Sequence, residues 1–167
     1  MSGFPEDIAD RASQYAAQRG MRLEEQLGSG VDGIVLRSDG PSAVKVFGRP
    51  SAYRRELACY ERLREHRVLA IHGHRVPQLL HFDDTLLVIE MTVVHPPFLL
   101  DFAGAYLDEA PEFSDGVMEQ WHEDKREQFG DVRWDQVQIL LAVLRRDYQI
   151  HLLDVNPGNI TFGEGEE

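Results

Sequence analysis

The sequence predicts an α+β fold, in which a five-stranded antiparallel sheet with one large helix is followed by a mostly helical half. Two observations carry this prediction. Short apolar runs of strand length, separated by glycine and Asp-Gly turns, fill most of the first 91 residues. Beyond residue 92, apolar side chains recur at helical spacing instead. We therefore divide the chain into an N-terminal helical extension (1–20), an N-terminal lobe (21–92) and a C-terminal lobe (93–167).

Local signals define the elements of the first half. Gly20 closes a short amphipathic helix, Asp39-Gly40 between two β-rich runs indicates a hairpin, and Pro50 suits the first turn of a helix. The expected elements are a helix over 7–19, strands over 21–27, 33–37 and 42–47, a helix over 50–66, and strands over 79–82 and 86–91.

The second half has the pattern of helices joined by loops. We expect helices over 98–107, 115–129 and 131–146, with a loop over 109–114. The last helix has the clearest pattern, because apolar residues recur three, four and seven positions after Val137. Ile139 and Val143 widen its apolar face, so this helix is predicted to be buried on more than one side.

Composition narrows the class of protein. With 167 residues, 43% of them hydrophobic, the chain suits one domain or a small two-lobed unit. No apolar run approaches the roughly 20 residues of a membrane span, and no signal-peptide pattern is present. The single cysteine, Cys59, excludes an internal disulfide, fits a reducing cytoplasm, and suits a helix core better than the role of a nucleophile. The net charge of −12 argues against a nucleic-acid partner.

The charges are distributed unevenly along the chain. Residues 108–127 contain eight acids and two bases, whereas residues 45–75 contain eight bases and three acids. Both segments could simply be solvated faces. Alternatively, a basic lobe favours a nucleotide and an acidic lobe favours a basic substrate or partner.

A glycine-rich segment followed by a lysine is the most informative pattern in the chain. Gly28, Gly30 and Gly33 form a G-x-G-x-x-G-x-V sequence that ends at Val35, and Lys45 follows within an apolar run. Glycines let a backbone hairpin approach phosphate oxygens, and a lysine on the next strand can reach those oxygens. Only two of the 17 basic residues are lysines, so a lysine in this run is unusual for the chain.

Two other interpretations of this pattern exist. Lys45 could be a surface lysine on an edge strand. A dinucleotide-binding fold uses similar glycines, but there they open a helix, and here they open a strand. The order of strand, glycine turn, strand, Asp-Gly turn and strand with lysine predicts an ATP site of the protein-kinase type.

A second motif lies near the end of the chain. Asp154 precedes Asn159 by five residues, with Pro157 between them. This is the spacing of a kinase catalytic loop, whose Asp accepts or orients the proton of the attacking hydroxyl and whose Asn binds Mg²⁺. The alternative is a plain loop, because Asp, Asn, Pro and Gly all form turns.

Together the motifs resemble the protein-kinase-like superfamily over residues 21–162, and the ending from Pro157 to Ile160 is similar to the aminoglycoside-phosphotransferase branch. The resemblance implies a kinase-like fold with a truncated C-terminal lobe. It implies that ATP contacts Gly28, Ser29, Gly30, Gly33, Val35, Ala43, Lys45, and the hinge residues Glu90, Met91 and Thr92.

An acidic partner for Lys45 is expected on the helix over 50–66. Glu56 and Glu61 are the two candidates. Glu56 is favoured, because Cys59 and Leu63 follow it three and seven positions later and mark its face as the inner one.

Two departures from the family pattern affect the expected chemistry. Leu152-Leu153 precede Asp154 in place of His-Arg or His-Gly, and the chain ends eight residues beyond Asn159. We therefore expect no Asp-Phe-Gly aspartate; Thr161-Phe162-Gly163 carries none. Acidic residues of the tail could replace it, namely Glu164, Glu166 or Glu167.

Two functions follow from the resemblance. The first is a minimal ATP-dependent phosphotransferase that uses Mg²⁺, with Asp154 and Lys45 as catalytic residues, Asn159 as metal ligand, and a protein or small molecule as acceptor. The alternative is a pseudokinase that binds nucleotide or only a partner. The wide apolar face of the helix over 131–146, or the segment 98–121, predicts a homodimer or a basic protein partner. His72 and His74 are interpreted as a surface loop rather than a metal site.

Overall fold

The computed structural model describes residues 6–102 and 104–163 and divides into two compact units. The first unit comprises Met1–Glu61 and Pro77–Val93, and the second comprises Arg62–Val76 and Val94–Glu167. Residues 62–76, which the sequence division placed in the N-terminal lobe, thus belong to the second unit. Among the described residues, no helix combines the length and apolar character needed to cross a membrane.

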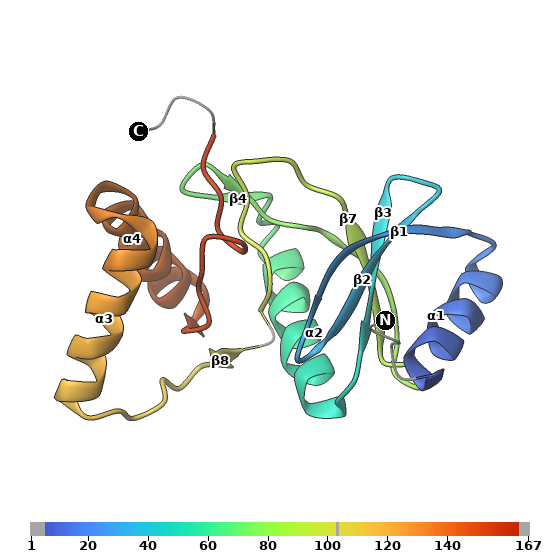
Figure 1. Cartoon of the computed structure of the whole chain (residues 1–167), viewed down its shortest axis with the longest axis horizontal. Coiled ribbons are helices and arrows are strands. Elements are labelled where there is room, and N and C mark those ends of the chain that lie inside the picture. Colours follow the sequence, from blue (N-terminus) through green and yellow to red (C-terminus); the bar gives the residue numbers. More distant parts are fainter. Residues whose placement is uncertain (1–5, 103, 164–167) are drawn as a thin grey trace. The chain divides into compact units, whose positions relative to one another are not determined.

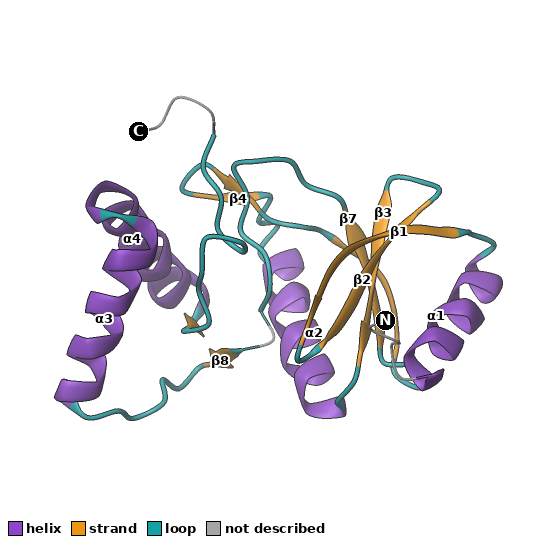
Figure 2. Cartoon of the chain, viewed as in Figure 1, coloured by secondary structure: helices purple, strands orange, loops and turns teal. Residues whose placement is uncertain are grey.

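A five-stranded sheet forms the centre of the first unit (Figures 1 and 2), and every pair of neighbouring strands is antiparallel. Its order is β1-β2-β3-β7-β6. The strands are β1 (Leu23–Gly30), β2 (Gly33–Ser38), β3 (Ser42–Phe47), β6 (Leu79–Asp83) and β7 (Val88–Thr92). The predicted α+β class with five antiparallel strands is therefore confirmed.

The two faces of β3 pack against different helices, α1 (Glu6–Arg19) and α2 (Pro50–Glu65). Side chains of α1, including Tyr15, share a core cluster with Val44 and Val46. On the opposite face, Tyr53 of α2 packs edge-on against Phe47, with 5.7 Å between ring centroids. Because successive residues of a strand point to opposite faces, Lys45 lies on the same face as Phe47. Burial on both faces explains the almost unbroken apolar run in which Lys45 stands.

The second unit is built around α3 (Asp115–Phe129) and α4 (Asp131–Tyr148). Gly130 joins them with a φ of 83°, and Phe129 then stacks on Trp134 with 5.9 Å between ring centroids. Four short strands complete the unit, namely β4 (Ala70–Ile71), β5 (His74–Arg75), β8 (Ala105–Leu107) and β9 (Ile150–Leu152).

The apolar face predicted for the last helix is largely covered within the second unit itself. Trp134, Val137, Leu140 and Leu144 of α4 are buried. Ile139 is exposed and Val143 is only partly buried, so the prediction that this helix is buried on more than one side is wrong. The homodimer or protein partner expected over this helix stays a prediction.

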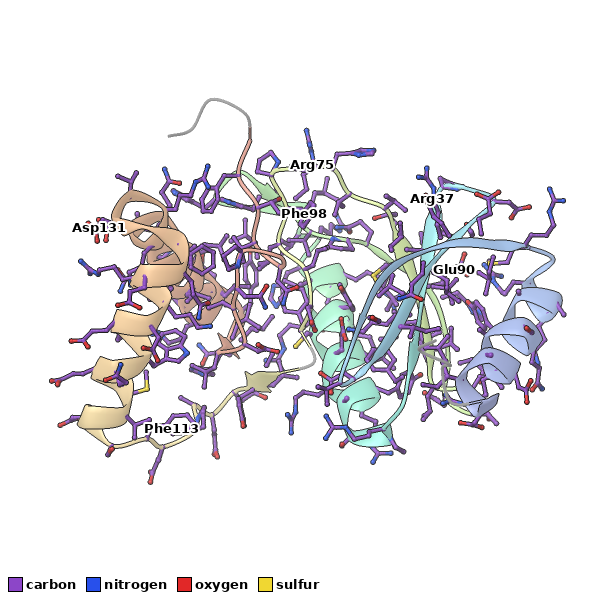
Figure 3. The ribbon with its side chains drawn as sticks, in the orientation of Figure 1. Arg37, Arg75, Glu90, Phe98, Phe113 and Asp131 are labelled. Carbon is purple, nitrogen blue, oxygen red and sulfur yellow. The ribbon has the colours of Figure 1, made fainter. Side chains whose placement is uncertain are left out.

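The helix predicted over 98–107 is wrong. The backbone of this segment bonds to distant residues, since Leu100 N donates to Asn159 O at 2.8 Å and Phe98 O accepts from Thr161 N at 3.0 Å (Figure 3 labels Phe98). Residues 105–107 form β8, which pairs with β9. Asp101 has a φ of 67°, which a right-handed helix excludes. The apolar residues here are buried by this pairing and not by a helical stripe.

Candidate functional site

The glycine segment forms the β1–β2 hairpin of the first unit. Gly30 pairs with Gly33 across a two-residue turn, so β1 continues past its predicted end at Leu27 and includes Gly28, Ser29 and Gly30. A Cβ built on Gly28 or Gly30 would meet no other described atom within 4 Å. Packing among the described residues therefore does not require glycine at either position, and an approaching ligand would find bare backbone there.

Close packing against strand β3 explains why the third position of the motif, residue 33, is a glycine. A Cβ on Gly33 would lie 2.1 Å from the backbone oxygen of Val46 in the neighbouring strand β3. The turn itself is fixed nearby, because Gly48 N donates to Asp32 O at 2.9 Å and the Asp32 carboxylate pairs with Arg49. Gly33 thus allows β2 to lie close to β3, and the turn is held to the residues that follow β3.

Alanine substitutions separate these two roles of glycine. Gly33→Ala is expected to lower the free energy of unfolding by about 1–3 kcal/mol, because the new methyl group overpacks against β3. Gly28→Ala is the matched control and should leave stability unchanged or raise it by up to about 1 kcal/mol. Urea unfolding, monitored by circular dichroism, measures the free energy of unfolding of both variants. Equal destabilisation by the two substitutions would contradict the packing difference.

Lys45 and Glu56 form a buried ion pair. Strand β3 places Lys45 between Val35 of β2 and Ile89 of β7, and its Nζ lies 2.7 Å from Glu56 Oε2. The Lys45 side chain is 9% exposed and that of Glu56 is 1% exposed. The Lys45 Nζ also lies 4.9 Å from the ring centroid of Phe47.

Helix α2 explains why Glu56 is the partner. Cys59, Tyr60 and Leu63 are all buried, so the stripe that begins at Glu56 faces inward. The predicted pairing of Lys45 with Glu56 and not with Glu61 is confirmed. The interpretation of Lys45 as a surface lysine is wrong, and Cys59 is confirmed as a core residue.

The predicted hinge residues Glu90, Met91 and Thr92 lie within β7, which has neighbours on both sides. Glu90 pairs with Val44 of β3 and with His81 of β6. Thr92 N donates to Gln78 O at 3.0 Å. Backbone groups of these residues are therefore already hydrogen-bonded to the neighbouring chain segments. The predicted contact of these three residues and of Ala43 with adenine stays a prediction.

The Glu90 side chain has a role that the sequence did not reveal (Figure 3). Its carboxylate accepts hydrogen bonds from Tyr15 Oη at 2.7 Å, from Arg19 Nε at 3.1 Å and from Ser42 Oγ at 3.0 Å. Burial, and then the bond to Glu90, raise the pKa of the Tyr15 hydroxyl above its usual range. This cluster ties α1 to β3 and β7. The one available signal was a lone acid inside the apolar run 86–91.

In the second unit, β9 leads directly into the predicted catalytic loop. Asp154 is exposed and Val155 is fully buried. Asn156 closes the turn, because its Oδ1 accepts from Gly158 N at 2.9 Å and its backbone oxygen accepts from Asn159 N at 3.0 Å. The backbone oxygen of Asn159 in turn accepts from Leu100 N at 2.8 Å. Hydrogen bonds within the loop and to Leu100 therefore fix the backbone between Asp154 and Asn159.

Two further residues position this loop, and neither was predicted. Lys125 of α3 donates from its Nζ to the backbone oxygen of Val155. A Cβ on Gly104 would lie 2.7 Å from the Cβ of Asp154. No local sequence pattern connects either residue to the loop.

Gly104→Ala is therefore expected to displace Asp154. If Asp154 acts in catalysis, a misplacement of about 1 Å can lower the rate by about 100-fold. Phosphoryl transfer and thermal unfolding of the variant measure the two effects. Gly116→Ala, at an open position of α3, is the control. Activity at the wild-type level in Gly104→Ala would contradict the assigned contact.

Metal binding receives limited support from the described residues. None of them form a group of three or more His, Cys, Asp or Glu side chains that could hold a metal ion. His74 Nδ1 lies 3.1 Å from the His72 backbone oxygen. Asn159 as a Mg²⁺ ligand stays a prediction, and the acidic tail residues Glu164, Glu166 and Glu167 lie outside the described residues.

Comparison with known proteins gives partial structural matches. No protein-family model matches the chain, and neither does any curated protein. The ternary complex of streptomycin, ATP and APH(2")-IIa matches 77% of this chain at 16% identity with a TM-score of 0.41, over 37% of its own length. The gentamicin complex of APH(2")-IIa matches 77% at 17% identity and a TM-score of 0.41, over 36% of its length.

A third match is the ADP-bound crystal structure of aminoglycoside phosphotransferase APH(2'')-Ib. It covers 72% of this chain at 17% identity with a TM-score of 0.41, over 35% of its own length. The chain thus spans little more than a third of the length of these proteins.

Proposed function

We propose that the chain is a phosphotransferase of the protein-kinase type, which binds ATP and transfers its γ-phosphoryl group to a hydroxyl. The buried Lys45–Glu56 ion pair carries this proposal. Burying two charges costs desolvation free energy, and apolar residues of similar size would stabilise a core as well or better. A buried ion pair between the central strand β3 and helix α2 is therefore weak support for stability, and its cation suits a role in binding an anion.

The first unit fits the phosphates of a nucleotide. Gly28 and Gly30 present backbone with no described atom near their Cβ positions, so phosphate oxygens can approach the amides. Lys45 would bind those oxygens, and Glu56 would hold the ammonium in position. Ser29 and Val35 lie in the same hairpin and would contact the nucleotide beside the glycines.

The second unit supplies the groups proposed for the transfer step. Asp154 would accept or orient the proton of the acceptor hydroxyl, because its carboxylate is exposed next to a fixed loop. The Asn159 side-chain oxygen would bind Mg²⁺ together with phosphate oxygens, since Mg²⁺ at nucleotide sites takes few protein ligands. When bound, Mg²⁺ neutralises charge on the phosphates.

A pair of measurements tests this function. Calorimetry with ATP and Mg²⁺ measures nucleotide binding, and γ-labelled ATP measures ADP release and labelling of the protein. Saturable binding together with transfer supports the phosphotransferase. Binding without transfer favours the second candidate, a regulatory nucleotide-binding module, for which the same Lys45–Glu56 pair would suffice. No binding at millimolar ATP would overturn both.

A further inference from the structure

We infer that the second unit binds a small organic anion in a pocket formed by the junction of α3 and α4 and the segment that follows the Asp154–Asn159 loop. The pocket has a volume of about 240 Å³. Gln128 and Arg133 line it from the two helices, Pro157 lines it from the loop, and Ile160 and Phe162 line it from the segment that follows. This inference goes beyond the proposed function and does not depend on nucleotide binding.

Each polar side chain that lines the pocket has a group that can donate a hydrogen bond. Among the described residues, no carboxylate lies within salt-bridge distance of the Arg133 guanidinium, and no acidic residue lines the pocket. Lys125 Nζ lies 3.3 Å from Gln128 Oε1, which leaves the Gln128 NH₂ group as a donor. Thr161 Oγ1 accepts from Phe98 N at 3.2 Å and keeps its own proton to donate. In a chain with a net charge of −12, a pocket with this lining favours an anion.

The remaining walls are apolar and restrict the size of the ligand. Phe129, Ile160 and Phe162 present aromatic and aliphatic surface to the pocket. The guanidinium carbon of Arg133 lies 5.2 Å from the ring centroid of Phe162, so the cation and the apolar wall are adjacent. The volume lies below the range of about 300–1,000 Å³ typical of drug-sized ligands. A single ring that carries one carboxylate or phosphate group matches both the size and the chemistry.

Calorimetric titration with three probes tests the inference. Phenyl phosphate and benzoate represent the two anion chemistries, and benzylamine has a similar ring with the opposite charge. We expect saturable binding of at least one anion and none of benzylamine. The stronger of the two anions then identifies the ligand as a phosphate or a carboxylate.

Matched arginine variants locate the site. Arg133→Gln is expected to weaken anion binding by about tenfold, the effect of losing one charged hydrogen-bond partner. Arg145→Gln is the control, because Arg145 is also exposed on α4 but does not line the pocket. Gln128→Leu, on the neighbouring helix, should also weaken binding. Thermal unfolding checks that each variant is folded.

Three outcomes would overturn the inference. The first is the absence of saturable binding when either anion is titrated to about 10 mM, because a dissociation constant above that value would be too weak to define a site. The second is an equal loss of affinity in Arg133→Gln and Arg145→Gln. The third is loss of anion binding in the double variant Lys45→Met, Glu56→Leu when thermal unfolding shows that this variant is folded, because that result would place the anion in the first unit. Anion binding that persists in the double variant, with ATP binding weakened, distinguishes this site from the proposed nucleotide site.

Discussion

Replacing Asp154 with asparagine is expected to lower phosphoryl transfer by about 10²–10⁴-fold, the usual contribution of a general base. Asparagine keeps the size of the side chain but cannot accept the proton of the attacking hydroxyl. The Asp154 carboxylate is exposed and forms no hydrogen bond or ion pair with another described residue. Its removal therefore leaves no buried partner unsatisfied, and the melting temperature and ATP affinity should not change.

The measurement compares transfer from γ-labelled ATP in the wild type, Asp154→Asn and Asp135→Asn. Asp135 is an exposed aspartate of α4 in the same unit, so its replacement controls for a general loss of negative charge. Transfer at the wild-type rate in Asp154→Asn would remove Asp154 from the mechanism. Lower ATP affinity in the same variant would show instead that Asp154 acts in nucleotide binding.

Elements with strong local signals were predicted from the sequence almost to the residue. Strand β3 and helix α3 have the predicted bounds, because an Asp-Gly turn precedes β3 and Ser114 caps α3 by accepting from Val117 N. The partner of Lys45 was also predictable. Glu56 shares its helical stripe with apolar residues, and a carboxylate on an inward stripe must meet a cation.

Features that depend on distant partners were not predictable. The segment 98–107 has apolar residues at spacings that suit a helix, yet its backbone pairs with residues 159–161 and with β9. One sequence does not identify such partners, because pairing in the fold does not depend on local periodicity. The same reason applies to Tyr15 and Glu90, which are 75 positions apart.

The same contrast between local signals and distant contacts applies to the candidate site. The residue types and their spacing predicted the pairing of Lys45 with Glu56, which is confirmed. The catalytic role of Asp154 stays a prediction. The contacts that hold the Asp154–Asn159 loop in place could not be predicted from the spacing of its residues. Gly104 leaves room for Asp154, and Lys125 holds the loop from another helix. Such supporting residues depend on tertiary packing, and their types, a glycine and a lysine, have no local pattern that marks them.

A double-mutant cycle at the buried ion pair should separate folding from function. Lys45→Met alone leaves the Glu56 carboxylate buried without this cation, and Glu56→Leu alone leaves the Lys45 ammonium without this anion. Each single substitution is expected to lower the free energy of unfolding by about 3–5 kcal/mol, the usual effect of breaking a buried pair. The double variant places two apolar side chains of similar volume at these positions, where α2 packs against β3. Its stability should return to the wild-type value or exceed it.

Nucleotide binding should not return with stability. If Lys45 binds phosphate oxygens, its loss weakens ATP by about 1–3 kcal/mol in the single and the double variant alike. Urea unfolding and ATP calorimetry on the four proteins measure both quantities. A double variant that is stable and still binds ATP with wild-type affinity would mean that the pair serves the fold alone. A stable double variant without ATP binding would mean that the chain keeps two buried charges for the nucleotide, since its core is as stable without them.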